Sequence, residues 1–110
     1  YLGGSLPIPA ELAFRATRLA EAAVSGIAGL RGYVGVDLVL GEKSDDDVVI
    51  EINPRLTTSY VGLRRYARGN LAAAILRAVE GREIGPLEWR TGRVVFSAEG
   101  QCGFTLEESC

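Results

Sequence analysis

The sequence predicts an α+β fold in which helices flank an antiparallel sheet. Two runs rich in β-type residues, Tyr33–Leu40 and Val48–Asn53, are separated by a short polar segment, a pattern typical of a hairpin. Apolar residues recur at helical spacing on either side of these runs, at 10–28 and 71–80. A further run at 93–98, RVVFSA, has the β-branched and aromatic content of a last strand.

The first helix is expected to begin near Ala10 and to end before Gly29, which provides a stop signal. Its apolar residues share one helical face, and they are Leu12, Ala16, Leu19, Ala20, Ala23 and Ile27. Its charged residues fall largely elsewhere, as a solvated face should, and they are Glu11, Arg15, Arg18 and Glu21. We expect this helix to cover the aliphatic side of the hairpin.

After the hairpin, residues 58–68 are expected to form a short helix or turn. Asn70 is placed to cap a second helix, and Gly81 is placed to end it. We take residues 1–98 as one domain, because a chain of 110 residues holds one small domain at most. The tail, residues 99–110, is expected to be poorly ordered.

Composition and charge exclude several classes of function. The apolar fraction of 47% is ordinary for a globular core, and a formal net charge of −2 gives no electrostatic basis for binding nucleic acid. No run reaches the roughly 20 apolar residues needed to span a bilayer, and a secretory signal is not apparent. We therefore expect a cytoplasmic protein whose partners are neither nucleic acids nor membranes. With no histidine, the chain contains no Ser-His or Cys-His nucleophilic site.

The predicted hairpin carries its polar side chains on one face. A regular antiparallel register sets Leu40 beside Val48. The same register sets Asp37 directly opposite Glu51, and Asn53 follows along the same face. The other face is then aliphatic and holds Val34, Val36, Leu38, Leu40, Val48, Ile50 and Ile52.

The opposed carboxylates of Asp37 and Glu51 favour a cation site. At ~5 Å and an effective dielectric of about 20, their repulsion is roughly 3 kcal/mol before hydration and screening reduce it. A divalent cation reverses the sign of this energy, and carboxylate and amide oxygens are the ligands that Mg²⁺ or Mn²⁺ prefers. The alternative is a hydrated sheet face without a ligand, since antiparallel sheets often expose one face to water.

The segment after the second run favours the cation site over the hydrated face. Pro54 ends the ladder of the strand because it has no N–H to donate. Arg55 then places a fixed positive charge just past the acidic cluster. A cation beside a metal site is useful when an anion binds between them.

These residues resemble the C-terminal part of the ATP-grasp ligases, in which a strand aspartate, a hairpin and an E-x-N motif occur in this order. Here the aspartate is Asp37 and the motif is E-I-N-P-R at 51–55. The resemblance implies that Asp37, Glu51 and Asn53 hold the Mg²⁺ or Mn²⁺ ions that bridge the phosphates of ATP. It also implies that Arg55 is a catalytic residue that faces the acyl phosphate or the transferred group.

The wider context is most similar to the branch that contains tyramine–glutamate ligase and related carboxylate–amine ligases. The segments that carry this similarity are GGSLPI, LRGYVGVDLVLG and EINPRLTTSYVGLR. Gly35 stands where D-alanine–D-alanine ligases have an arginine, so that subgroup does not fit. Thr57, Thr58 and Ser59 would donate hydrogen bonds to a substrate carboxylate or phosphate, or would serve as turn residues that cap the next helix.

The resemblance implies that the parent protein is an ATP- and Mg²⁺-dependent ligase with a small-molecule acid and a small-molecule amine as substrates. The acid would be activated as an acyl phosphate, which the amine then attacks. The alternative is a non-catalytic nucleotide-binding, metal-binding or structural module of the same fold. The lysines that contact ATP in the family precede this segment, and Lys43 is expected to be a solvated loop residue. We therefore expect the fragment alone to be inactive.

Overall fold

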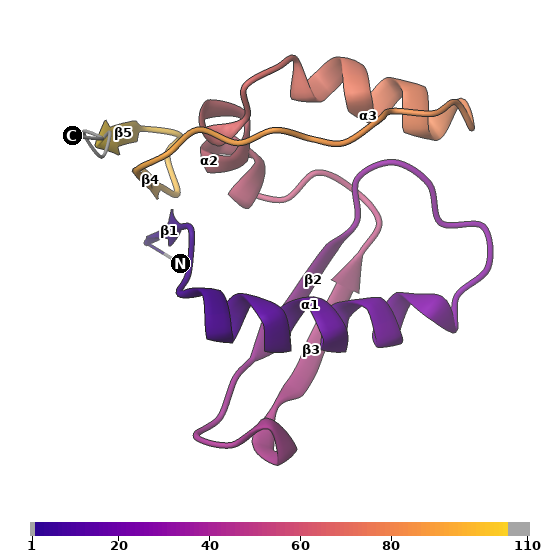
Figure 1. The fold of residues 1–110 in the computed structure, drawn as a ribbon, viewed down its shortest axis with the longest axis vertical. Coiled ribbons are helices and arrows are strands. Elements are labelled where there is room, and N and C mark those ends of the chain that lie inside the picture. The colour runs from indigo at the N-terminus through magenta and orange to yellow at the C-terminus, as the bar shows by residue number, and fades with distance from the viewer. Residues whose placement is uncertain (1, 106–110) are drawn as a thin grey trace. The chain divides into compact units, whose positions relative to one another are not determined.

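The computed structural model describes residues 2–105 and has the expected α+β architecture with antiparallel sheets (Figure 1). Its elements are β1 (Gly3–Leu6), α1 (Ala10–Ser25), β2 (Gly35–Val39), the 3₁₀ turn η1 (Ser44–Asp46), β3 (Val48–Asn53), α2 (Ser59–Tyr66), α3 (Leu71–Val79), β4 (Arg93–Ser97) and β5 (Cys102–Thr105). The chain divides into two compact units. We call Ile8–Leu56 the hairpin unit, and we call the residues up to Pro7 together with those from Thr57 onward the sheet unit.

In the hairpin unit, β2 and β3 pair antiparallel, as predicted. Asp37 lies directly opposite Glu51. Beyond Asp37 the register shifts by one residue, so that Leu38 lies opposite Val49 and Ile50 is an extra residue in β3. This extra residue is a β-bulge, in which two residues of one strand oppose one residue of the other.

The bulge changes the pairing and the faces of the loop-side half of the hairpin. Val48 lies opposite Val39, so the expected pairing of Leu40 with Val48 is wrong. Val49 is half-buried, whereas the side chain of Ile50 is 63% exposed. The half-buried face consists of Val36, Leu38, Val49 and Ile52. The expectation that Val48 and Ile50 belong to this face is therefore wrong.

Helix α1 packs against both β2 and β3, and it covers the hairpin as expected (Figure 1). It ends at Ser25 rather than near Ala28, because the N–H of Ile27 bonds to the carbonyl of Val24 at 3.0 Å and tightens the last turn around Gly26. The predicted stripe is half-buried at Leu12, Ala16, Leu19, Ala20 and Ala23, whereas Ile27 lies beyond the helix.

The sheet unit is built on a three-stranded antiparallel sheet in the order β1-β4-β5. The last predicted strand is confirmed as β4, but β1 and β5 were not predicted. β5 lies inside residues 99–110, the segment expected to be a poorly ordered tail. Residues 106–110 lie outside the described part of the chain.

The core of the sheet unit is centred on Val94 and Phe96 of β4, which are 0% and 5% exposed. Two glycines allow close approach to the ring of Phe96. A Cβ atom on Gly4 of β1 would lie 2.7 Å from Phe96 Cζ, and one on Gly62 of α2 would lie 2.6 Å from Phe96 Cδ1. Helix α2 therefore packs directly on the sheet.

Helix α3 confirms the predicted cap. The side-chain Oδ1 of Asn70 accepts a hydrogen bond from the N–H of Ala73 at 3.0 Å, which satisfies a donor that the first turn leaves unpaired. The helix ends at Val79, followed by Gly81 with a φ of 76°, a backbone conformation that favours glycine.

Candidate functional site

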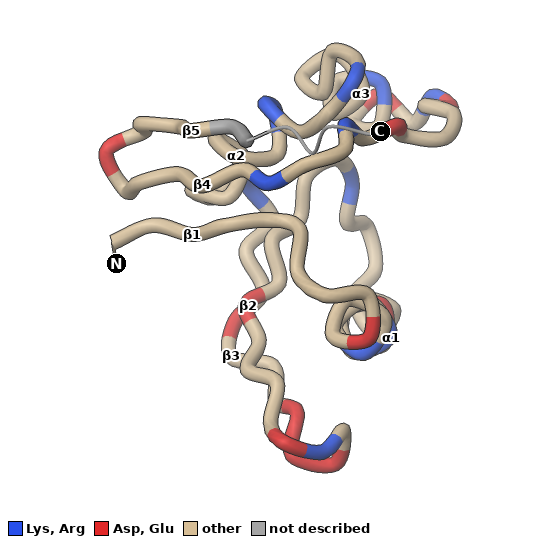
Figure 2. The backbone as a smooth tube through the Cα atoms, turned by 60° about the vertical axis from the view of Figure 1, so that its left-hand side comes forward, with Lys and Arg blue, Asp and Glu red and all other residues tan. Residues whose placement is uncertain are grey.

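The predicted site centres on Asp37 of β2 and Glu51 of β3, which lie directly opposite each other and are both exposed. In Figure 2, red acidic segments mark the middle of the hairpin near the labels β2 and β3. The Cβ atoms of directly opposite residues are about 4.5–5.5 Å apart in antiparallel pairs. Among residues 2–105, the ion pairs are Arg15–Asp47 and Arg82–Glu80, so no basic side chain neutralises this pair.

Asn53 lies two residues after Glu51 and therefore on the same face of β3. Its partner across the hairpin is Gly35, which has no side chain to fill the position. Asn53 is 8% exposed, and it is the buried polar residue of the described core. The structure thus brings the three predicted metal ligands to one face of the hairpin, at successive positions of that face, with the Val36–Ile52 pair between them on the opposite face.

Arg55 follows this cluster in a tight turn. Its N–H donates to the carbonyl of Asn53 at 2.8 Å, and its Nη1 donates to the carbonyl of Leu56 at 3.0 Å. The side chain is exposed. The charge of Arg55 therefore lies on an exposed side chain directly after the strand that carries Glu51 and Asn53.

Thr57, Thr58 and Ser59 belong to the sheet unit, where the two threonines precede α2 and Ser59 is its first residue. The turn is closed by backbone groups, because Tyr60 donates its N–H to the carbonyl of Thr57 at 3.0 Å. Thr58 occupies the N-cap position but makes no side-chain cap hydrogen bond. The alternative role of Thr58 as a side-chain cap is therefore not supported.

A second polar cluster, which the sequence did not reveal, closes the hairpin loop. Asp47 accepts two hydrogen bonds from the guanidinium of Arg15, one from Nε at 3.0 Å and one from Nη2. The same Nη2 donates to the carbonyl of Gly41 at 2.9 Å, and the N–H of Gly41 donates to Asp47 Oδ1 at 2.9 Å. We call these three residues the loop clamp. Arg15 was expected on the solvated face of its helix, and that expectation is wrong.

The loop clamp is largely shielded from water, with side-chain exposures of 23% for Arg15 and 6% for Asp47. The hydrogen bond from Arg15 lowers the pKa of Asp47 below its usual value, against the opposing effect of desolvation, and the N–H of Gly41 lowers it further. The sequence held a weak signal for this cluster: Gly41 and Asp47 flank the loop, and Arg15 borders the apolar stripe beside Leu12 and Ala16.

The remaining loop residues do not add to the predicted metal site. Lys43 is exposed in the hairpin loop, as expected. In the part of the chain that the structure describes, no group of three or more His, Cys, Asp or Glu side chains is arranged to hold a metal ion. The predicted ligand set contains only two carboxylates and completes its donors with the amide of Asn53.

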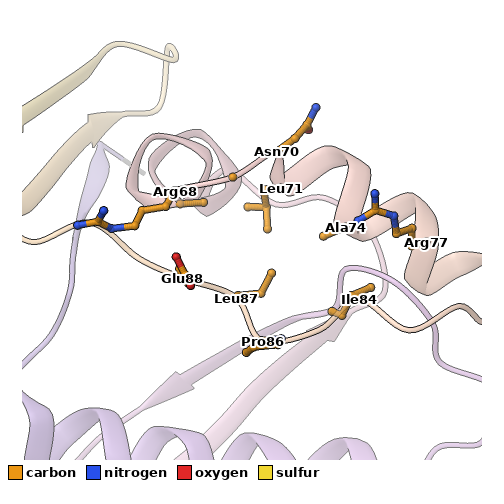
Figure 3. Close-up of a pocket in the computed structure, with 11 residues that line it drawn as sticks. Arg68, Asn70, Leu71, Ala74, Arg77, Ile84, Pro86, Leu87 and Glu88 are labelled. Atoms are coloured by element: carbon orange, nitrogen blue, oxygen red, sulfur yellow. The ribbon is translucent and has the colours of Figure 1, made fainter.

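A separate cavity of about 230 Å³ lies in the sheet unit. Leu71 and Ala74 of α3 line one side of it, and Ile84, Pro86 and Leu87 line the other (Figure 3). None of the predicted site residues lines this cavity.

Comparison with known proteins decides the family. The ATP-grasp domain family matches residues 1–59, which is more than half of the 110-residue chain. The chain belongs to the ATP-grasp family. This finding confirms the predicted resemblance and fold class. Every residue of the predicted site lies within the region matched by the ATP-grasp family.

Two curated proteins are similar to this ATP-grasp chain. The tyramine–L-glutamate ligase of Methanocaldococcus fervens is 36% identical over 84 residues, which are 76% of this chain and 27% of that protein. The enzyme of the same name from Methanocaldococcus jannaschii is also 36% identical over 84 residues, covering 76% of this chain and 26% of that protein. The chain thus spans about a quarter of the length of these relatives.

Two further findings concern solved structures and membrane-spanning helices. No solved structure matches the chain significantly. Within residues 2–105, none of the helices has the length and apolar character that crossing a membrane requires.

Proposed function

We propose that the chain is the metal-binding end of an ATP- and Mg²⁺-dependent carboxylate–amine ligase. The observation that supports this most directly is the opposed pair of Asp37 and Glu51, with Asn53 beside it on the same face of the hairpin. This face lies within the region that matches the ATP-grasp family.

The three side chains fit Mg²⁺ or Mn²⁺ in charge and in donor type. Asp37 and Glu51 supply carboxylate oxygens that no basic side chain within residues 2–105 neutralises. Asn53 supplies an amide oxygen, and all three are hard donors. Mg²⁺ is usually held by one or two carboxylates together with phosphates and water, so a larger protein cage is not required. When bound, the ion would neutralise charge on the phosphate oxygens of ATP.

The proposed reaction has two steps. A carboxylate oxygen of the acid attacks the γ-phosphorus of ATP, the bond from that phosphorus to the bridging oxygen breaks, and ADP leaves. The amine nitrogen then attacks the acyl carbon of the acyl phosphate, phosphate leaves, and the nitrogen loses a proton to form the amide. Arg55 would stabilise negative charge on the transferred phosphoryl group, because its guanidinium presents paired donors to such oxygens. Thr57, Thr58 and Ser59 would donate hydrogen bonds to a carboxylate or phosphate of the substrate.

The substrate class is inferred from the relatives. Both similar proteins are named for joining tyramine to L-glutamate. We therefore infer that the acid is an amino acid carboxylate and that the amine is a small primary amine. L-Glutamate and tyramine are the first pair to test in phosphate-release assays on the full-length protein.

Substitution of the ligands tests the metal site. In the full-length protein, Glu51→Gln and Asn53→Ala are expected to weaken Mn²⁺ binding and to lower ATP-dependent phosphate release by at least ~10-fold, about 1.4 kcal/mol. The melting temperature of Glu51→Gln should change little, because Glu51 is exposed and the lost interaction is with the metal. Mn²⁺ binding is measured by electron paramagnetic resonance.

Asp45→Asn provides the matched control, because Asp45 is an exposed acid in the loop of the same hairpin. This variant should bind Mn²⁺ as the unsubstituted protein does. Full activity of Glu51→Gln at saturating Mg²⁺ would remove Glu51 from the site. A protein that binds Mn²⁺ and ATP but releases no phosphate with any acid and amine would instead be the non-catalytic module.

A further inference from the structure

The loop clamp and the bulge lie in the same hairpin as the proposed metal ligands. We infer that Arg15 is a positioning residue for that site, because its ion pair with Asp47 holds β2 and β3 in the bulged register beside Glu51. The inference rests on the proposed function and names a residue that controls the geometry of the site. It is carried by the pairing of the strands, the exposure of their side chains and the hydrogen bonds of the loop.

The register in which β2 pairs with β3 differs by one residue between the two halves of the hairpin. In the half that contains the acidic pair, Asp37 lies opposite Glu51. In the loop-side half, Val39 lies opposite Val48, one residue away from a regular continuation. Ile50 absorbs the difference as the bulge, immediately before Glu51. Bulges bend a strand and increase its twist, so they change the direction of neighbouring side chains.

A regular register competes with the observed one. Without a bulge, Leu40 would lie opposite Val48, and Ile50 would join the aliphatic face that α1 covers. In the observed register, Val48 and Ile50 are instead 49% and 63% exposed, and Val49 alone takes the half-buried position that the two of them would share in the regular register. Burial of apolar surface alone therefore favours the regular register. Another interaction must stabilise the bulged one.

The loop clamp supplies that interaction. In the regular register, Gly41 would lie directly opposite Asp47 and continue the ladder. In the structure, both backbone groups of Gly41 are occupied by side chains, the N–H by Asp47 and the carbonyl by Arg15. The backbone N–H of Asp47 is also occupied, because it donates to the carbonyl of Ser44 at 3.1 Å. The clamp and the continued ladder therefore exclude each other.

The hydrogen bonds between Arg15 and Asp47 are stronger than hydrogen bonds between neutral groups, because both partners are charged. Two parallel donors from a guanidinium to one carboxylate form a charge-assisted pair with fixed geometry. Asp47 is 6% exposed, so removing Arg15 would leave a shielded carboxylate without its cation. Such a hairpin should shift toward the regular register, in which Ile50 moves to the other face and the strand relaxes beside Glu51.

Disulfide trapping measures the register directly. In the full-length protein with its native cysteines replaced by serine, Val39→Cys/Val48→Cys can bridge only in the bulged register. Leu40→Cys/Val48→Cys can bridge only in the regular register, since a bridge needs Cα atoms within roughly 4.4–6.8 Å and Cβ atoms that point toward each other. With Arg15 intact, the 39–48 pair should oxidise readily and the 40–48 pair should not.

Arg15→Gln and Asp47→Asn are each expected to raise the yield of the 40–48 crosslink several-fold and to weaken Mn²⁺ binding by ~10-fold. Arg18→Gln is the matched control, because Arg18 is exposed on the same helix and contacts the ring of Phe14 rather than an acid. It should change neither measurement. Arg15→Lys, which keeps the charge but loses the paired donors, should resemble Arg15→Gln and serves if that variant does not fold.

Rescue separates positioning from general stability. In the Arg15→Gln protein, oxidising the 39–48 cysteine pair should restore Mn²⁺ affinity, because the bridge replaces the clamp in holding the bulged register. An unchanged crosslinking pattern in Arg15→Gln, or a loss of affinity that the bridge does not restore, would overturn the inference. Mn²⁺ binding that is indifferent to Glu51→Gln would overturn the proposed function instead, and the crosslinking result does not depend on the metal.

Discussion

At the scale of single residues, two acidic side chains of the hairpin are placed unfavourably for the stability of the sheet. Asp37 and Glu51 repel each other across the hairpin, and within residues 2–105 no basic side chain pairs with them. A sheet that served only as scaffold would gain from replacing either with threonine or lysine, since cross-strand pairs of like charge are unfavourable. This unfavourable pairing supports the proposed metal site.

Replacing Arg55 by lysine tests the proposed catalytic role of this single residue. Lysine carries the same charge but cannot present two coplanar donors to a phosphoryl or carboxylate group. We expect Arg55→Lys in the full-length protein to keep its melting temperature and ATP binding, yet to lower phosphate release with acid and amine by at least ~10-fold, about 1.4 kcal/mol of transition-state stabilisation. Arg18→Lys on α1 is the control.

Two outcomes would contradict this role for Arg55. If Arg55→Lys keeps the full rate, the arginine is only a surface residue of the turn after β3. If the substitution unfolds the protein, its hydrogen bond to the carbonyl of Leu56 serves the fold instead.

At the scale of elements, the hairpin should be sensitive to acid. Arg15 lowers the pKa of Asp47 below its usual value, so the clamp contributes stability above that value and loses it as pH falls through the lowered pKa. In thermal melts from about pH 6 to about pH 2.5, the difference between the unsubstituted protein and Asp47→Asn should shrink toward zero at the acid end. Asp45→Asn, which removes an exposed acid, should show no such convergence. A constant difference for Asp47→Asn would mean that its carboxylate charge does not hold the loop.

The elements also show what the sequence can and cannot predict. The pairing of Asp37 with Glu51 followed from strand alternation, and the cap of α3 followed from Asn70, because both depend on neighbours in the chain. The bulge could not be predicted from the sequence, because regular pairing of the two strands buries more aliphatic surface. The contact that stabilises the bulged register instead joins Arg15 to Asp47, a residue 32 positions away.

The short strands β1 and β5 escaped prediction for a related reason. Their sequences, GGSL and CGFT, contain glycine and few β-branched residues. Each becomes a strand by pairing with β4, whose own sequence is rich in such residues. Local preference therefore identified the central strand of the sheet but not its edges.

At the scale of the whole chain, the proposed metal ligands and the core around Phe96 belong to different compact units. Asp37, Glu51 and Asn53 all come from the hairpin unit, whereas Val94 and Phe96 stabilise the sheet unit. Substitutions that act on separate sets of contacts usually have additive effects. Damage to one core should therefore leave the metal affinity of the other unit unchanged.

Gly62→Val tests this independence. A Cβ atom at Gly62 would lie 2.6 Å from Phe96 Cδ1 and 2.9 Å from Leu6 Cδ2, so we expect overpacking to destabilise the full-length protein by about 1–3 kcal/mol in urea unfolding. Gly69→Val is the matched control, because a Cβ atom there meets nothing within 4 Å. Mn²⁺ affinity should stay within about twofold of the unsubstituted value in both variants, since no ligand comes from the sheet unit. If Gly62→Val weakened Mn²⁺ binding as strongly as Arg15→Gln, the geometry of the site would depend on the sheet unit as well, and the loop clamp would not be enough to position Glu51.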